Sequence, residues 1–220
     1  VSFMLHIHSM TTFILHCIDP SAGKVDTSTL SHQTLMELLI TNLTNADRLC
    51  GSPEDPRPIK QWRGLSFSED AVISIDWGRM RLEGTIDFKW LPDTLEIFTL
   101  WGNTVHGSID FSVFPRTLKT FDVQGNPFSG TIDLTCLPPK LEALMVNATN
   151  LSGTLDLTKL PDTLQNLDLS DNAFEGETDF SNLPYSLRMI DVRGTRLSGI
   201  FEDRDELRFL CAGTDVIVFE

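Results

Sequence analysis

The 220-residue chain has little positive charge. Lysine and arginine number 17 against 31 aspartates and glutamates, which leaves a formal net charge of −14. So acidic a protein repels phosphate groups, which argues against nonspecific binding to nucleic acids and to acidic membrane surfaces. The acidity is compatible with a basic partner and, more simply, with a surface that only keeps the protein soluble. We therefore expect no nucleic-acid partner.

Cysteine is also scarce. The cysteines lie far apart, with no Cys-x-x-Cys pair and no spacing typical of a metal site, at Cys17, Cys50, Cys136 and Cys211. We interpret them as free thiols in a reducing compartment, which predicts a cytoplasmic location. Three sequons leave open the alternative of a secreted or cell-surface protein, although such short motifs also arise by chance: Asn42, Asn147 and Asn150.

Long apolar runs are missing as well. No stretch of about 18 apolar residues occurs, so we expect no membrane-spanning helix and no membrane insertion. Residues 3–18 are fairly apolar, but they contain three histidines and lack the basic start of a signal peptide. His6, His8 and His16 lie near Cys17, yet nothing in the sequence fixes their geometry. We therefore expect bystander histidines, no metal site and no cofactor.

Glycine marks a regular period along the chain. Six glycines follow one another at a constant interval, at Gly84, Gly107, Gly130, Gly153, Gly176 and Gly199. Between two of them, a Leu-x-x-Leu-x-Leu-x-x-Asn pattern is formed by Leu164, Leu167, Leu169 and Asn172. This combination resembles the leucine-rich repeat. More closely, residues 62–198 resemble the kinetoplastid-type repeats of protists, whose pattern is near LSGTIDLTxLPxxLxxLDLSxNxFSG. The resemblance implies an α/β fold, a right-handed solenoid with a parallel sheet on its concave face.

We divide the chain into an N-terminal extension with a helical cap at 1–61, repeats at 62–198, and a C-terminal cap at 199–220. The repeats comprise a degenerate first one at 62–83 and five full ones at 84–198. The final turn is expected to be three positions shorter than the others, with Leu210 following Ile190 at the core position. Both caps are needed because a terminal repeat would otherwise expose its apolar interior.

The N-terminal cap is predicted to contain a helix over residues 28–44. Leu35, Leu39 and Leu43 recur at helical spacing, and Ser28 or Ser31 is a suitable N-cap. Residues 50–58 read as a loop because they are rich in proline and turn formers.

Each full repeat is predicted to contain two strands. The Leu-x-x-Leu-x-Leu segment gives the concave strand, and Gly-Thr-Ile-Asp-Leu, as at 130–134, shows strand alternation with an outward aspartate. The resemblance implies that the residue at the asparagine position turns inward and bonds the backbone of adjoining turns. These residues are Asn103, Asn126, Thr149, Asn172 and Thr195.

One aspartate recurs in every full repeat, and we call this set the aspartate ladder: Asp87, Asp110, Asp133, Asp156 and Asp179. On stacked strands about 4.8 Å apart, neighbouring carboxylates would repel each other. They must therefore be solvated, splayed, hydrogen-bonded or counter-charged, and hydroxyls two residues on offer local bonds. We expect a structural rung repeated by duplication, with a row of cations or a dock for a basic partner as the alternative.

The candidate binding site lies on the outward positions of the concave strands. The central column reads Asp76, Thr99, Asp122, Met145, Asp168 and Asp191. Flanking positions hold Ile97, Ala143, Met189, Trp101, Gln124, Asn147 and Arg193. Tryptophan beside methionine and carboxylates is typical of an interface hot spot, whereas neutral drift of exposed residues is the alternative. We predict an acidic interaction surface anchored by Trp101.

No catalytic constellation is evident. No serine or cysteine pairs with a histidine at a recognisable spacing, and the repeated aspartates offer no unique pair with opposed environments. We therefore predict a non-catalytic protein–protein interaction module or scaffold subunit. Its partner is expected to be a protein, either basic or part of a larger complex. The alternative is a cell-surface or secreted adhesion or recognition protein.

Overall fold

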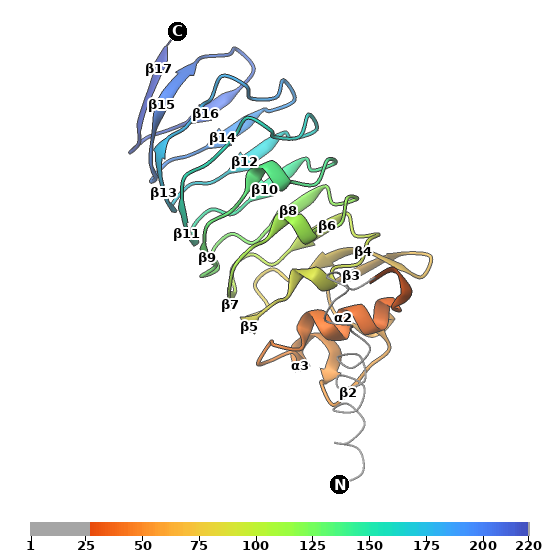
Figure 1. Cartoon of the computed structure of the whole chain (residues 1–220). Coiled ribbons are helices and arrows are strands. Elements are labelled where there is room, and N and C mark those ends of the chain that lie inside the picture. The colour runs from red at the N-terminus through yellow and green to blue at the C-terminus, as the bar shows by residue number, and fades with distance from the viewer. Residues whose placement is uncertain (1–26, 220) are drawn as a thin grey trace, which may run out of the picture.

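Short strands stack into two sheets along the axis of an elongated solenoid (Figure 1). The computed structural model describes residues 27–219. A small helical cap lies at the N-terminal end, and the chain then winds turn upon turn to the C-terminal end. This arrangement confirms the predicted solenoid with a parallel sheet.

The larger sheet, called the main sheet here, has eight strands in the order β16-β14-β12-β10-β8-β6-β4-β3. Phe121 pairs with Phe98 on one side and with Leu144 on the other, a spacing of one repeat in each direction. Apolar residues of successive repeats therefore lie side by side. The strands are β3 (Leu65–Ser68), β4 (Ala71–Asp76), β6 (Ile97–Thr99), β8 (Thr120–Asp122), β10 (Ala143–Met145), β12 (Asn166–Asp168), β14 (Met189–Asp191) and β16 (Arg208–Leu210).

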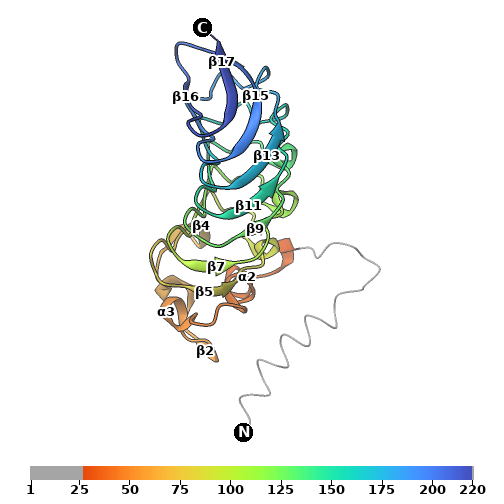
Figure 2. The same ribbon diagram turned by 90° about the vertical axis from the view of Figure 1, so that its left-hand side faces the viewer.

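The second sheet runs along another side of the solenoid (Figure 2). Two of its strands pair with each other and the remaining five form a continuous parallel sheet. A single bridge between Gly107 and Phe128 lies between the two groups. The strands are β5 (Glu83–Thr85), β7 (Thr104–His106), β9 (Ser129–Gly130), β11 (Asn150–Gly153), β13 (Ala173–Glu177), β15 (Arg196–Glu202) and β17 (Asp215–Phe219).

The predicted second strand at 130–134 is wrong in position. Strand β9 ends at Gly130, and the chain then turns into the 3-10 helix η5 (Leu134–Cys136). Asp133 causes this turn because its carboxylate accepts hydrogen bonds from the N–H and the hydroxyl of Thr135 (2.9 and 2.6 Å). The same capping occurs at η3 (Phe88–Trp90) and η4 (Phe111–Val113).

The aspartate ladder is therefore a set of turn caps and does not lie on adjacent strands. Each member accepts a hydrogen bond from the backbone N–H two residues on. Hydrogen bonds from Thr135, Thr158 and Ser181 lower the pKa values of Asp133, Asp156 and Asp179. Repulsion between neighbouring members persists, since Asp133 raises the pKa of Asp156, but the hydrogen bonds from Thr158 outweigh it.

The N-terminal cap is built on α2 (His32–Ile40), which is shorter than the predicted 28–44 helix. A separate 3-10 turn, η1 (Thr27–Thr29), precedes α2. Ser31 is the N-cap of α2, and its Oγ accepts a hydrogen bond from the N–H of Thr34 (3.1 Å). Leu43 lies beyond the helix end and bridges to Gly84 of the first full repeat. The helix buries its apolar face and packs against η3 and η2 (Ile59–Gln61).

Two features of the N-terminal part, one in the cap and one in the degenerate repeat, were not predicted. The segment expected to be a loop contains the end of α3 (Asp47–Cys50) and an antiparallel pair of short strands, β1 (Gly51–Ser52) and β2 (Asp55–Pro56). Within the degenerate repeat, β3 folds back antiparallel on β4 and forms the N-terminal edge of the main sheet. Val72, Ile75 and Trp77 occupy the predicted core positions and are fully buried.

One continuous apolar core runs through the solenoid between the two sheets. Its N-terminal half contains six phenylalanine rings in mutual contact, called the aromatic cluster: Phe88, Phe98, Phe111, Phe114, Phe121 and Phe128. The C-terminal half is filled mainly by leucine. The residues at the asparagine position all lie buried in this interior.

The last turn is shorter than predicted by one position. Phe209 pairs with Ile190 in the main sheet, whereas the sequence pattern placed Leu210 there. The ring of Phe209 stacks on Phe201 (centroids 4.0 Å apart) and meets Phe180 edge-on. A large aromatic side chain therefore takes the core position, and Leu210 lies half-exposed beside Asp191.

Candidate interaction face

The predicted binding residues share one face of the main sheet, which we call the sheet face. Strand register aligns the central column in a row, with Asp76 beside Thr99, Thr99 beside Asp122, and so on to Asp191. A second row contains Ile97, Ala143 and Met189, and the residues two positions after the central row flank its other side. The structure thus brings the predicted set together.

The central row is less open than the sequence suggested. Asp122 is 9% exposed and Asp191 only 3% exposed, so these two carboxylates are buried. Asp122 accepts hydrogen bonds from the N–H and the side-chain amide of Gln124 (3.1 and 3.0 Å). Asp191 is held in the same way by Arg193, whose Nη2 lies 2.6 Å from Oδ2. In each case the residue two positions on covers the carboxylate, which is why half of the expected acidic surface is not exposed.

The row still carries partly desolvated negative charge. Burial raises the pKa values of Asp122 and Asp168, and the negative charges of other aspartates in the row add to the increase. Asp168 accepts hydrogen bonds from Ser170, and Asp76 at the N-terminal end of the row is exposed. A cation approaching the row would therefore be favoured, because it would offset charge that the fold has removed from water.

This pKa shift predicts a pH-dependent effect of Asp122→Asn. A carboxylate whose folded pKa lies above its unfolded value opposes folding at higher pH. That cost decreases once the pH falls below the folded pKa and is gone below the unfolded pKa. We expect the Asn variant to melt higher than the wild type at pH 8, with the gap closing by about pH 4, near the unfolded pKa of an aspartate. Thermal unfolding monitored by circular dichroism across this range measures the gap.

The matched control is Asp156→Asn on the aspartate ladder, where the pKa is lowered by hydrogen bonds from Thr158. There the carboxylate stabilises the fold above its unfolded pKa, so the variant should melt lower at neutral pH and converge with the wild type on acidification. Equal and pH-independent shifts in both variants would contradict the prediction.

Trp101 lies at one side of the sheet face, where an arginine stacks on it. Its ring is half-buried, and the guanidinium carbon of Arg79 lies 4.6 Å from the ring centroid. Gly78 leaves room for the indole, since a Cβ there would lie 2.2 Å from Trp101 Nε1. Ile97, on the same face of β6, is 39% exposed. We call Gly78, Arg79 and Trp101 the Trp101 corner, and Ile97 lies across the central row from it.

Sequence reasoning identified Trp101 and Ile97 but missed Gly78 and Arg79, the two neighbours of Trp101. A signal was present, because Gly78 precedes Trp101 by one repeat length and Arg79 precedes Gly102 by the same distance. A residue without a side chain one turn earlier is what allows an indole to lie flat along the sheet. Arg79 then stacks on the ring, an interaction that orients the indole.

Asn147 adds an unused acceptor to the sheet face. Its Oδ1 is buried and has no hydrogen-bond partner among residues 27–219, and its Nδ2 lies 3.5 Å from Gln124 Oε1. A donor from outside would satisfy this oxygen. In the same sequon, the Thr149 hydroxyl is buried and donates to Val146 O and Asn172 Oδ1.

Other residues singled out in the sequence lie elsewhere. Within residues 27–219, no group of three or more His, Cys, Asp or Glu is arranged to hold a metal, and no helix is long and apolar enough to cross a membrane. Cys50 is buried, Cys136 exposed and Cys211 half-exposed, all as free thiols. The histidine grouping near Cys17 lies outside the described residues.

Comparison with solved structures identifies the fold. No protein-family model and no curated protein matches the sequence. Pollen receptor kinase 3 shares 22% identity over 84% of this chain and 95% of its own, with a TM-score of 0.69. The ectodomain of the Arabidopsis thaliana receptor kinase SOBIR1 shares 24% over 80% and 98%, with a TM-score of 0.57. The A. thaliana BIR2 ectodomain shares 18% over 75% and 92%, also with 0.57. The chain therefore has the fold of a leucine-rich-repeat ectodomain.

Proposed function

We propose that the chain is a non-catalytic protein-interaction module that binds a protein partner through the Trp101 corner and the adjoining aspartate row. The observation that carries this proposal is a half-buried tryptophan, stacked by Arg79, on the same face as exposed Ile97 and the row of aspartates. Large aromatic side chains in partly desolvated positions contribute most of the binding energy at interfaces. Fold alone does not define function, so the proposal rests on this surface.

The sheet face indicates the chemistry of the partner. Apolar side chains would cover Trp101 and Ile97 on the two sides of the row, and a lysine or arginine would offset the charge of Asp122 and Asp168. A backbone or side-chain N–H would satisfy Asn147 Oδ1. A protein segment that combines apolar and basic residues fits these requirements.

Known complexes of similar folds agree with a polypeptide partner. BIR3 and SERK2 of A. thaliana were crystallised as a complex, and the matching chain shares 24% identity with a TM-score of 0.56. The A. thaliana receptor kinase GASSHO1/SCHENGEN3 was crystallised with CASPARIAN STRIP INTEGRITY FACTOR 2, and this chain covers 30% of that longer ectodomain, with a TM-score of 0.53.

The proposal predicts that Ile97→Lys removes partner binding. The variant places a cation at an exposed apolar position of the sheet face, and we expect at least about tenfold less partner in affinity capture followed by mass spectrometry. Trp101→Ala should give a similar loss. Asp122→Lys is unsuitable because that carboxylate is buried.

Val113→Lys is the matched control, because Val113 is 36% exposed but belongs to η4, away from the main sheet. It should capture the partner as well as the wild type does. Melting temperatures of all three variants establish that they are folded. Identical capture by the Ile97 and Val113 variants would exclude the sheet face as the binding surface.

For location, we propose the cell surface or the secreted space. The cytoplasmic location expected from the cysteines has no support from the comparisons, which include receptor-kinase ectodomains. Asn42 and Asn150 are exposed and available for glycosylation. Intact-mass spectrometry after expression in a secretory eukaryotic host tests this: glycan mass on either asparagine supports it, and unmodified protein retained inside the cell counts against it. The closer likeness to kinetoplastid-type repeats stays a prediction.

A further inference from the structure

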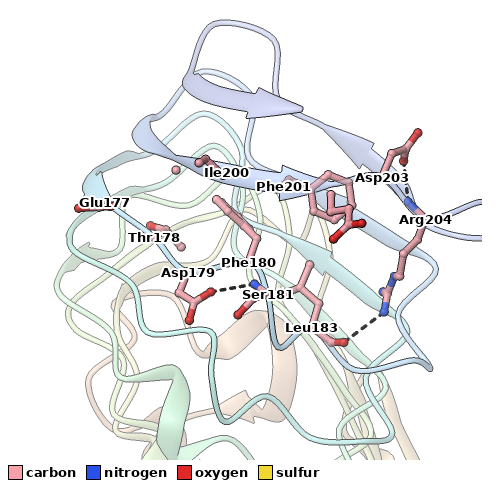
Figure 3. Close-up of a pocket in the computed structure, with 12 residues that line it drawn as sticks. Glu177, Thr178, Asp179, Phe180, Ser181, Leu183, Ile200, Phe201, Asp203 and Arg204 are labelled. Atoms are coloured by element: carbon pink, nitrogen blue, oxygen red, sulfur yellow. Dashed lines mark hydrogen bonds between the residues drawn. The ribbon is translucent and has the colours of Figure 1, made fainter. Parts of the chain in front are cut away.

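The last turn of the solenoid diverges from the turn before it. Strand β15 pairs with β13 only as far as Ser198, and from there to Glu202 it pairs with β17 alone. At the corresponding position the earlier turns have an aspartate that caps a turn, as Asp179 does. One repeat later this position is Glu202, and there β15 continues as a strand. The divergence leaves a hollow of about 750 Å³ between residues 177–183 and 199–204 (Figure 3).

The hollow combines an apolar wall with an acidic rim. Phe180, Leu183 and Phe201 form the wall and are nearly fully buried, and Ile200 at the lip is 62% exposed. The rim carries four carboxylates, from Glu177, Asp179, Glu202 and Asp203. Its one cation among the lining residues, Arg204, directs its guanidinium to the carbonyl oxygens of Leu183 and Pro184 (3.2 Å each). The charge of the rim therefore favours a cationic occupant.

Thr178 gives the hollow an unpaired polar group. In the four preceding repeats this position holds a buried aliphatic residue: Ile86, Ile109, Ile132 and Leu155. Thr178 is 2% exposed and lines the hollow, and its hydroxyl has no hydrogen-bond partner in the described part of the chain. A buried hydroxyl without a partner destabilises a fold, so its presence where the turns diverge points to a partner from outside.

We propose that this hollow binds an organic cation, an apolar body that carries a primary ammonium or a guanidinium group. The body packs on Phe180 and Phe201, and the cationic head lies among the rim carboxylates. Glu177 and Asp179 line the same hollow as Thr178, so a head group that donates a hydrogen bond to Thr178 Oγ1 also lies near acidic side chains. Such a group is supplied either by a free amine or by a lysine or arginine side chain of a peptide.

Titration of the ¹⁵N-labelled chain with 2-phenylethylamine tests the proposal, with phenylacetate as the anionic counterpart of similar size. We expect amide shifts confined to residues 177–183 and 199–204 with the amine and none there with the anion. The peptide acetyl-Gly-Lys-Phe-Lys-Gly-amide distinguishes the two sources. Binding at least about tenfold tighter than that of the amine indicates a peptide ligand, and equal or weaker binding indicates a free amine.

Variants test whether binding of the amine depends on this hollow or only on the overall negative charge of the protein. Thr178→Ile restores the aliphatic residue of the other repeats, so it should stay folded and abolish the amine-induced shifts. Thr178→Val removes only the hydroxyl and should weaken binding about fivefold. Glu202→Gln combined with Asp203→Asn should do the same, whereas Glu175→Gln, outside the hollow, should change nothing. Retained binding in a folded Thr178→Ile variant, or equal shifts with phenylacetate, would overturn the proposal. Ile97→Lys leaves this site intact, so the proposal for the sheet face and the proposal for the hollow can be tested separately.

Discussion

Asn126→Val is expected to lower the free energy of unfolding by about 3–5 kcal/mol. Asn126 is 2% exposed, and its Oδ1 accepts from the backbone N–H of Val105 (3.1 Å). Its Nδ2 donates to the carbonyl oxygens of Leu100 and Val123 (2.9 and 3.1 Å). One side chain thus pairs buried backbone groups from its own turn and from the turn before. Valine would leave those groups unpaired, at about 1–3 kcal/mol each. Urea unfolding at equilibrium measures the loss.

Asn126→Thr is the matched control, because the chain itself uses threonine at this position in two other turns. The hydroxyl of Thr149 donates to Val146 O, which reproduces the bond to the carbonyl three residues back. A hydroxyl at 126 should keep that bond and lose the ones to the preceding turn. We expect about half the effect of valine, which has nearly the same shape. Equal losses for the two variants would show that packing, and not backbone pairing, is the cause.

Phe121→Ala is expected to cost a similar amount, about 3–5 kcal/mol. Phe121 is fully buried at the centre of the aromatic cluster. Its ring centroid lies 4.8 Å from that of Phe114, 5.5 Å from Phe98 and 5.6 Å from Phe88. Removing the ring opens a cavity and ends ring contacts within its own turn and with the turn before. Because each turn is stabilised mainly by its neighbours, the loss should broaden the unfolding transition as well as shift it.

Phe121→Leu tests whether the cavity explains this cost. Leu144 and Leu167 hold the same place in the next two strands, so the backbone accepts leucine at this register. We expect a loss of about 1–2 kcal/mol for this variant, because leucine refills part of the space. A loss as large as that of alanine would indicate that ring–ring contacts, and not volume, dominate in the cluster.

The repeat period was sufficient to predict most of the fold. A constant repeat length aligns Phe98, Phe121 and Leu144, and the pairing of the main sheet follows directly from it. The second sheet was misplaced because alternation around Asp133 is compatible both with a strand and with an aspartate-capped turn. Only the hydrogen bonds to Thr135 distinguish the two. The final turn was misjudged because two adjacent apolar residues, Phe209 and Leu210, compete for one core position.

The sequence was sufficient to predict which residues lie on the sheet face, but not which of them are exposed to solvent. Strand alternation placed Asp122 and Asp191 on the sheet face, where they lie. Whether they reach solvent depends on how Gln124 and Arg193 fold back over them, which strand alternation does not specify. The hollow beside Thr178 was not predicted, although a threonine among four aliphatic equivalents was visible in the sequence.

The constant register also limits how such a chain changes length. Inserting or deleting one whole turn returns every later side chain to its own row, so duplication of the DNA that encodes a turn would lengthen the molecule without disturbing its interior. Any other change in length within the repeats moves apolar residues out of the interior and polar ones into it. The shortened step between Ile190 and Phe209 lies at the last strand of the main sheet, where no later row depends on it. Growth of this molecule therefore proceeds by whole turns, and the shortened turn of the main sheet lies at its end.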